Sequence, residues 1–424
     1  MIDLVRASAQ AGYLVLWEEI ARDGAQQKTL LSGAQRVAVA RATSAVFGGA
    51  APNHLIFAAG FPSICREEFE AIRELAAEVD TCHLVTHGRA TRKDIDRSLA
   101  AIRGARYGRV SFFVPVSERM SAALLHIPSR QALTQACDIA AYAVDRAAGV
   151  PIDIALADAT RAAPGFVAEA ATRLTTAGVR VVKICDTVGD LYPRAAAAYF
   201  QQIREQVPAD VVLGVHLHND YGLALANNLE AVTAGLRILA GAWLGLGERN
   251  GLAATEQLLL ALALDPEQRA AQLGLAGPLW VAPPNLRGVV PLARHLSALT
   301  GVPLKGTDPH VGTEVNAIST GTPFTDPDVF QPYDPDAVLG VPRTVTLTQL
   351  ASTDVIRHVA ATLGFALDRD QAQRALDWVK TTAYRRGTAV LPLTEYSAFL
   401  AGLAVPAAEQ PSPRPADLAI GVEA

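Results

Sequence analysis

The chain has 424 residues, of which 50% are hydrophobic and 19% are charged, and its formal net charge is −5. This balance is typical of a globular protein and excludes a largely disordered one. The acidic balance argues against nucleic-acid binding, which favours clustered Lys and Arg. The four cysteines occur singly, as expected of reduced thiols, and no apolar run is long enough to span a membrane. We therefore expect a cytoplasmic protein that acts on a small molecule.

Short β-rich runs recur along the first part of the chain, and helical stretches rich in Ala, Glu and Arg separate them. The eight runs cover residues 13–19, 54–60, 81–87, 109–116, 152–158, 180–187, 210–218 and 236–243. Each is almost continuously apolar, which predicts strands covered on both faces. Eight strand–helix units predict a (β/α)8 TIM barrel. A doubly wound sheet is the alternative, but it predicts a glycine-rich turn after the first strand, where this chain has Arg22 to Gln27.

The regular alternation of strands and helices stops near residue 265. We expect residues 1–268 to form the barrel and residues 269–288 a proline-rich linker. Residues 289–403 are expected to form a small, mostly helical subdomain, and residues 404–424 a disordered tail. The helical subdomain could cover the mouth of the barrel or join two subunits. We expect a homodimer, because the apolar segment 277–303 needs a surface to cover it.

Polar residues are concentrated where several of the predicted strands end. In a barrel of parallel strands the reactive groups lie at these carboxyl ends. His216 and His218 are two residues apart in the seventh run, so both side chains point to the same face. Together with Asp23, they form a set of two nitrogens and one oxygen that could hold a divalent metal and leave positions open for an oxygen ligand. The alternative is a pair of core histidines satisfied by hydrogen bonds.

Five motifs follow one another in order at the predicted strand ends. They are R-D-G-A-Q at 22–26, D-A-T-R at 158–161, D-T-V-G at 186–189, H-L-H-N-D-Y-G-L-A-L-A-N at 216–227 and G-L-G-E-R-N-G at 245–251. In combination they resemble the isopropylmalate, homocitrate and citramalate synthases over roughly residues 12–340, with hydroxymethylglutaryl-CoA lyase as a more distant member. The resemblance implies a barrel enzyme that condenses acetyl-CoA with a 2-oxo acid to give a 2-substituted malate and CoA.

The resemblance also implies roles for individual residues. Asp23, His216 and His218 would bind a divalent metal, either Mg²⁺, Mn²⁺ or Zn²⁺. Arg22 would hydrogen-bond the ketone oxygen, and Thr187 would hold the carboxylate of the substrate. A bound metal polarises a carbonyl as a Lewis acid, and a guanidinium stabilises the alkoxide that forms. In this family the lid of one subunit covers the barrel of its partner, which again implies a homodimer.

Five further residues are candidates with less defined roles. Gln26, Arg161 and Asn250 are expected to contact the substrate, and Asn250 matches the homocitrate-synthase form of its loop. Glu248 could orient the metal site or could accept hydrogen bonds from its neighbour Arg249. The fifth residue is Lys183, which is predicted to face the barrel interior.

The chain departs from the family pattern in ways that bear on the acceptor. Ala58 stands where the synthases carry the glutamate of E-x-G-F-P, and Ala157 where they carry that of S-P-E-D-A-T-R. These changes favour a roomier pocket for a bulky apolar 2-oxo acid. Lys183 favours the opposite, unless it is paired, because burying a lone ammonium is costly. It could bind Glu18 or Glu19, or an acidic group of the acceptor, so both acceptor classes stay open.

The lid motif G-I-H of the synthases, whose His helps to deprotonate acetyl-CoA, reads G-T-E at 312–314 here. Either Glu314 or the preceding His310 could serve as the base. Alternatively, the lid has lost its base. Two other readings remain. One keeps the metal but cleaves a carbon–carbon bond, as an aldolase or lyase does, although the Cys-containing loop of the lyase is absent after the eighth run. In the other, the metal set is degenerate and the protein is no enzyme.

Overall fold

The computed structural model describes residues 2–27 and 29–403. The expected disordered tail, residues 404–424, lies outside the described residues. The chain divides after Pro303 into two compact units, and each is described by itself. Among the described residues, no helix is both long enough and apolar enough to cross a membrane.

The first unit is a closed barrel of eight parallel strands in sequential order, which confirms the predicted fold. The strands are β1 (Val15–Glu18), β2 (Leu55–Gly60), β3 (His83–Arg89), β4 (Gly108–Pro115), β5 (Ile152–Ala157), β6 (Val181–Asp186), β7 (Leu213–Leu217) and β8 (Ile238–Gly241). Every residue of β1, β2, β5, β6, β7 and β8 is buried, as their continuous apolar character predicts.

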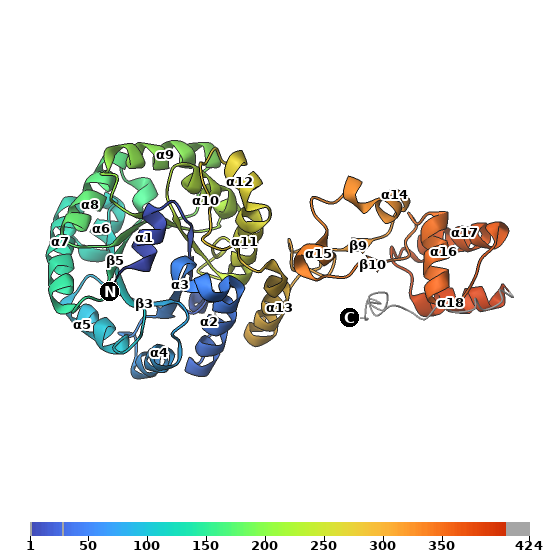
Figure 1. Ribbon diagram of the computed structural model, residues 1–424, viewed down its shortest axis with the longest axis horizontal. Coiled ribbons are helices and arrows are strands. Elements are labelled where there is room, and N and C mark those ends of the chain that lie inside the picture. Colours follow the sequence, from blue (N-terminus) through green and yellow to red (C-terminus); the bar gives the residue numbers. More distant parts are fainter. Residues whose placement is uncertain (1, 28, 404–424) are drawn as a thin grey trace. The chain divides into compact units, whose positions relative to one another are not determined.

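Helices surround the barrel (Figure 1). They are α2 (Gly33–Phe47), α3 (Ala51–His54), α4 (Arg66–Glu78), α5 (Arg92–Ala101), α6 (Glu118–Leu125), α7 (Ser129–Arg146), α8 (Pro164–Thr176), α9 (Pro193–Gln206), α10 (Ala224–Thr233), α11 (Thr255–Ala263) and α12 (Pro266–Gln272). Their first residues follow the expected start signals. Ser32 and Gln35 form a capping box at α2, and α8 and α9 begin with proline.

A short N-terminal helix, α1 (Leu4–Gln10), closes the amino-terminal end of the barrel. Its Val5 and Ala9 belong to the same buried cluster as Trp17, Ala58 and Val85 from the barrel interior. The opposite end, where the strands finish, is left to loops and to short 3₁₀ turns at 24–27, 159–161 and 243–245. This arrangement leaves the carboxyl ends of the strands as the face that can hold reactive groups.

Helix α13 (Val289–Thr300), which the sequence groups with the lid, belongs to the first unit. Its apolar side, with Val290, Leu292 and Leu296, is buried. The second unit contains α14 (Gly321–Thr325), α15 (Pro335–Leu339), α16 (Thr353–Thr362), α17 (Arg369–Arg386) and α18 (Leu393–Gly402), and two short strands, β9 (Ala317–Ile318) and β10 (Thr344–Val345). Its own core includes Val355 and Tyr396, both fully buried.

Candidate metal centre and active site

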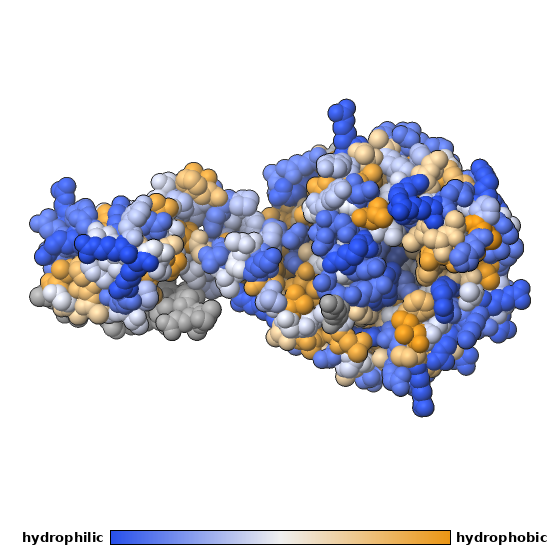
Figure 2. All heavy atoms as spheres, turned by 180° about the vertical axis from the view of Figure 1, so that it is seen from behind, coloured by the Kyte–Doolittle hydropathy of each residue, from blue (hydrophilic) through white to orange (hydrophobic). Residues whose placement is uncertain are grey.

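Three side chains from two segments, which β8 separates in the barrel, meet at the carboxyl end of the strands. Asp23 follows β1, His216 lies in β7, and His218 follows β7 directly. All three are buried, and one ligand atom of each lies within 4.8 Å of the others. Figure 2 shows the face opposite α1, where hydrophilic side chains gather around a hollow in the middle of the barrel. The fold therefore brings together the three metal-ligand candidates that the sequence predicted.

The polar atoms of this set suit a divalent metal. His218 Nδ1 is buried and has no hydrogen-bond partner among the described residues. An unpartnered buried polar atom costs about 1–3 kcal/mol, which a bound ligand would offset. Burial lowers the pKa of His218 to about 4, so the imidazole is in the neutral form that metals bind. Asp23 is fixed in place, because its two oxygens accept hydrogen bonds from Arg22 Nη1 at 2.7 Å and from the backbone N–H of Glu248 at 3.1 Å.

Below the metal set, Glu19 is the centre of a buried ion network. It is fully buried, and its carboxylate lies 3.2 Å from Lys183 Nζ and 3.1 Å from Arg22 Nε. Burial raises the pKa of Glu19, but the charges of Arg22 and Lys183 outweigh this effect and hold the pKa well below its usual range. The Lys183 ammonium also lies 3.5 Å from the centre of the Trp17 ring. Lys183 is thus paired within the protein.

Two histidines face the same carboxylate. Glu19 Oε1 lies 3.5 Å from His216 Nδ1 and 3.8 Å from His87 Nε2. Burial lowers the pKa of His87 well below its usual range, so this ring is neutral. Sequence reasoning missed His87. The signal that could have found it is its position on β3 at an inward-facing register, level with the ligand-bearing part of β7.

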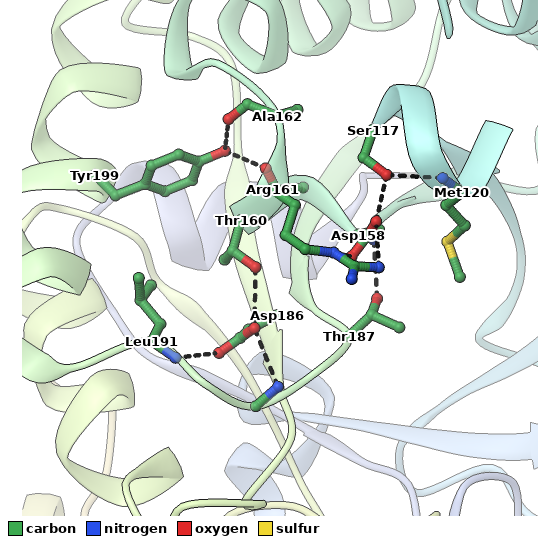
Figure 3. Close-up of polar contacts among 12 residues, drawn as sticks. Ser117, Met120, Asp158, Thr160, Arg161, Ala162, Asp186, Thr187, Leu191 and Tyr199 are labelled. Atoms are coloured by element: carbon green, nitrogen blue, oxygen red, sulfur yellow. Dashed lines mark hydrogen bonds and ion pairs between the residues drawn. The ribbon is translucent and has the colours of Figure 1, made fainter. Parts of the chain in front are cut away.

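Thr187, the expected carboxylate holder, is oriented by the loop after β5 (Figure 3). Its hydroxyl oxygen accepts a hydrogen bond of 2.8 Å from the backbone N–H of Asp158, so the hydroxyl proton stays available for another acceptor. Asp158 is held in a left-handed conformation, with φ at 60°, by its hydrogen bond from Ser117 and its ion pair with Arg161. Arg161 donates twice to Asp158, at 2.6 and 2.8 Å. Its guanidinium is therefore committed to this carboxylate.

The motif D-T-V-G builds the neighbouring turn. Asp186 accepts hydrogen bonds from the hydroxyl of Thr160 at 2.9 Å and from the backbone N–H groups of Gly189 and Leu191 (Figure 3). This carboxylate orders the loop that presents Thr187. Asp186 thus positions the site and does not point into it.

The loop after β8 is held by Arg249. Its guanidinium makes two hydrogen bonds of 2.9 Å to Asp220 and one of 2.7 Å to the carbonyl of Thr187. Glu248 brings its backbone N–H to Asp23, whereas its half-exposed carboxylate lies 3.6 Å from Arg249. Asn250 is exposed and donates to the carbonyl of Asp220 at 3.4 Å. Of the two readings of Glu248, the geometry favours a backbone role.

The remaining candidates belong to the turn after Asp23 and to the second unit. Gln26 is exposed in the 3₁₀ turn after Asp23. His310 and Glu314 belong to the second unit, where both line a pocket of about 250 Å³. His310 Nδ1 lies 2.8 Å from the hydroxyl of Tyr333, and burial lowers the pKa of the imidazole.

The alanines at the positions where the chain departs from the family pattern are almost fully buried. Ala58 is fully buried and belongs to the same interior cluster as Trp17. No open space therefore adjoins Ala58 itself, and the roomier acceptor pocket stays a prediction. Ala155 and Ala157 are 6% and 9% exposed, so only a small part of their surface is accessible.

The family model described as HMGL-like matches residues 16–275. A 2-isopropylmalate synthase from Solidesulfovibrio magneticus is 33% identical over 63% of this chain and 50% of its own length. The 2-isopropylmalate synthase 1 from Caldanaerobacter subterraneus subsp. tengcongensis is 28% identical over 79% of this chain and 83% of its own length. The chain thus spans only half of the first relative.

Solved structures support the fold. The HMG-CoA lyase from Bacillus subtilis has a TM-score of 0.56 at 17% identity, covering 71% of this chain and 97% of the lyase. The lyase from Brucella melitensis has a TM-score of 0.53 at 19% identity, covering 68% and 99%. The resemblance carried by the five motifs is confirmed. The chain belongs to the HMGL-like family, with distant relatives named 2-isopropylmalate synthase.

Proposed function

We propose that the protein catalyses the metal-dependent Claisen condensation of acetyl-CoA with a 2-oxo acid, giving a 2-substituted malate and CoA. The observation that carries this proposal is the meeting of Asp23, His216 and His218 beside Arg22 and Thr187 at one end of the barrel. The names of the distant relatives support the same chemistry. No separate observation favours a lyase, because the likeness to the lyases concerns the fold.

The polar groups at the carboxyl end of the barrel that lack a protein partner could bind the metal and the 2-oxo acid. Asp23, His216 and His218 would hold the metal, which when bound polarises the ketone of the 2-oxo acid as a Lewis acid. Arg22 uses Nε and Nη1 on Glu19 and Asp23, while its Nη2 has no hydrogen bond to any residue that the structure describes. This nitrogen is free to donate to the ketone oxygen and to stabilise the alkoxide. The Thr187 hydroxyl donates to the carboxylate.

The carbon–carbon bond needs a base and then a water molecule. We assign the base to His310 or Glu314, which would remove a proton from the acetyl methyl group. The resulting enolate attacks the ketone carbon, and water hydrolyses the thioester, so that CoA leaves as the free thiol. Since both candidate bases belong to the second unit, the proposal includes a homodimer in which this unit serves the barrel of the partner.

The ion pairs of Lys183 and Arg161 bear on the class of 2-oxo acid that the site accepts. Lys183 is paired with Glu19, and Arg161 with Asp158. A second carboxylate on the acceptor would find both cations already neutralised, and burying an unpaired charge is costly. We therefore propose a 2-oxo acid with an apolar side chain in place of a dicarboxylic one.

Release of free thiol from acetyl-CoA tests both parts of the proposal. The metal-supplemented chain is incubated with pyruvate, 2-oxoisovalerate, phenylpyruvate or 2-oxoglutarate, with acetyl-CoA alone as the blank. Thiol release with an apolar acid and none with 2-oxoglutarate is the expected result. Release with 2-oxoglutarate alone would overturn the acceptor class and keep the condensation. If no acid gives thiol but a 3-hydroxyacyl-CoA is cleaved, the lyase reading replaces the condensation.

A further inference from the structure

A second polar pocket lies at the amino-terminal end of the barrel, the end opposite the metal set. Its volume is about 370 Å³, and it is lined by the end of α1, by the segment from α9 to β7, and by the residues just before β8. Two arginines, Arg204 and Arg237, belong to its wall, together with Gln10, Val207 and Ala209. None of these residues takes part in the reaction proposed above.

Arg237 has no carboxylate partner within 4 Å in the described part of the chain. Its Nε donates to the carbonyl of Gly12 at 3.0 Å and its Nη1 to that of Val232 at 2.7 Å. Nη2 makes no hydrogen bond within residues 2–27 and 29–403. Burial alone lowers the pKa of Arg237, with no nearby acid to offset it. A half-buried positive charge is therefore left without an opposite charge.

Arg204, on the other side of the pocket, is bound in the same way. It donates to the carbonyls of Val211 at 2.8 Å, of Val207 at 3.2 Å and of Pro208, and no described residue accepts from its Nε. The acid that acts on its charge is Asp210, which forms an ion pair with Arg6 at 3.5 Å and whose side chain is 65% exposed. Burial lowers the pKa of Arg204, and Asp210 offsets this effect only in part.

The positions of the carbonyls explain part of this arrangement, because cations are favourable at helix C-termini. Val207 follows α9, Val232 lies in the last turn of α10, and Gly12 follows α1. Capping leaves the remaining N–H groups unused. Elsewhere in the barrel, the buried arginines Arg36 and Arg109 have carboxylates, Glu68 and Asp153. The two arginines of this pocket differ from them in lacking such a partner.

We propose that this pocket binds a small anion through the guanidinium groups of Arg204 and Arg237. A carboxylate or a phosphate would fit, because both accept the paired N–H groups of a guanidinium. The site would be separate from the acceptor site, since it lies at the other end of the strands. A bound anion would join α1, α9 and the start of β8.

Calorimetric titration of the full chain with inorganic phosphate, and separately with succinate, tests the proposal at constant ionic strength. We expect saturable binding of one or both anions, and the two arms show whether phosphate or carboxylate is preferred. In Arg237→Gln, binding should be at least about tenfold weaker, because a charge-assisted hydrogen bond is lost. The matched control is Arg103→Gln, which removes one charge from an exposed position outside the pocket.

A second variant keeps all the arginine hydrogen bonds. Ala209→Glu places a carboxylate at the exposed edge of the pocket, where it would compete with the added anion. We expect it to weaken binding as Arg237→Gln does, and it decides the test if Arg237→Gln fails to fold. The proposal is overturned if the unaltered chain binds neither anion more than matched chloride. Unchanged binding in Ala209→Glu, or equal weakening in Arg103→Gln, would overturn it as well.

Discussion

Two buried ion networks occupy the same barrel, one at each end. At the amino-terminal end, Arg109 is fully buried and donates to both oxygens of Asp153 at 2.8 Å and to Asp3 at 2.7 Å. At the carboxyl end, Glu19 gathers Lys183 and Arg22. Both networks are buried, and both compensate their charges.

The two networks differ in the groups that surround them. All three guanidinium nitrogens of Arg109 donate to carboxylates and join α1 to β4 and β5. Asp3 Oδ2 and both ring nitrogens of the nearby His83 have no hydrogen-bond partner in the described residues. At the carboxyl end, His218 Nδ1 and both ring nitrogens of His87 lack hydrogen-bond partners in the described residues. The unpartnered nitrogens of the carboxyl end lie beside the metal-capable set of Asp23, His216 and His218, and no such set includes Arg109 or its partners among the described residues. The comparison thus separates a structural network from a candidate active site.

The largest expected effect comes from removing a metal ligand. His218→Ala should abolish stoichiometric binding of divalent metal and lower kcat/KM on the order of a thousandfold, since Lewis-acid stabilisation is worth several kcal/mol. Metal content after dialysis and thiol release measure the two effects. His295→Ala, an exposed position on α13, is the matched control. Full metal content in His218→Ala would contradict the assignment.

Breaking the Arg109 network should lower stability and leave the metal site intact. Arg109→Met leaves Asp153 buried without a counter-charge and should lower the free energy of unfolding by about 3–5 kcal/mol. Urea unfolding measures this loss. The folded fraction should bind metal as the unaltered chain does. If Arg109→Met loses metal at unchanged stability, the two networks do not have the separate roles that we assign to them.

A substitution at Glu19 tests the network at the carboxyl end without removing a metal ligand. A carboxylate beside His216 Nδ1 fixes the ring and raises the basicity of its other nitrogen, and such partners are typically worth about 10–100-fold in metal affinity. Glu19→Gln should therefore weaken metal binding within that range, measured by competition with a chelating dye. A purely structural role predicts reduced stability with unchanged metal affinity.

The sequence could predict the parts of the site that lie close together along the chain or at strand ends. The two-residue spacing of His216 and His218 and the position of Asp23 follow from strand geometry alone. The partners of the buried charges were harder to predict. Lys183 could pair with a glutamate of the first strand or with an acidic acceptor, and only the structure shows that Glu19 lies 3.2 Å away. The sequence suggested that Arg161 contacts the substrate. The structure shows instead that it pairs with the carboxylate of Asp158, whose backbone is left-handed.

Long-range packing was the other limit. A single sequence shows that Ala58 lacks a carboxylate, but not that it packs in one buried cluster with Trp17 from the neighbouring strand. The sequence could not assign α13 to the first unit for the same reason. Its apolar face is equally consistent with a helix of the lid, and only the structure shows that it belongs to the first unit.

The smallest expected effect concerns Glu18, which joins the two loops of the site. Its carboxylate accepts hydrogen bonds from the backbone N–H groups of Ile20 and Trp243. Burial raises the pKa of Glu18 to about 8. Because the folded chain holds this proton more tightly than the unfolded chain, the free energy of unfolding should fall as pH rises to about 8. The slope for one proton is at most about 1.4 kcal/mol per pH unit.

Glu18→Gln mimics the protonated carboxyl group and should remove that slope. Chemical unfolding at several pH values between the usual pKa of glutamate and 8 measures it for both proteins. An identical pH dependence in the two chains would show that Glu18 is ionised in the folded protein.

The fate of the acetyl group tests the central claim most directly. The metal-loaded chain is incubated with an apolar 2-oxo acid and acetyl-CoA labelled with ¹³C at both acetyl carbons, and the products are identified by mass spectrometry. The proposed reaction predicts a 2-substituted malate that carries both labelled carbons, formed together with free CoA. Labelled acetate as the sole product would mean simple thioester hydrolysis, and would contradict a condensing enzyme.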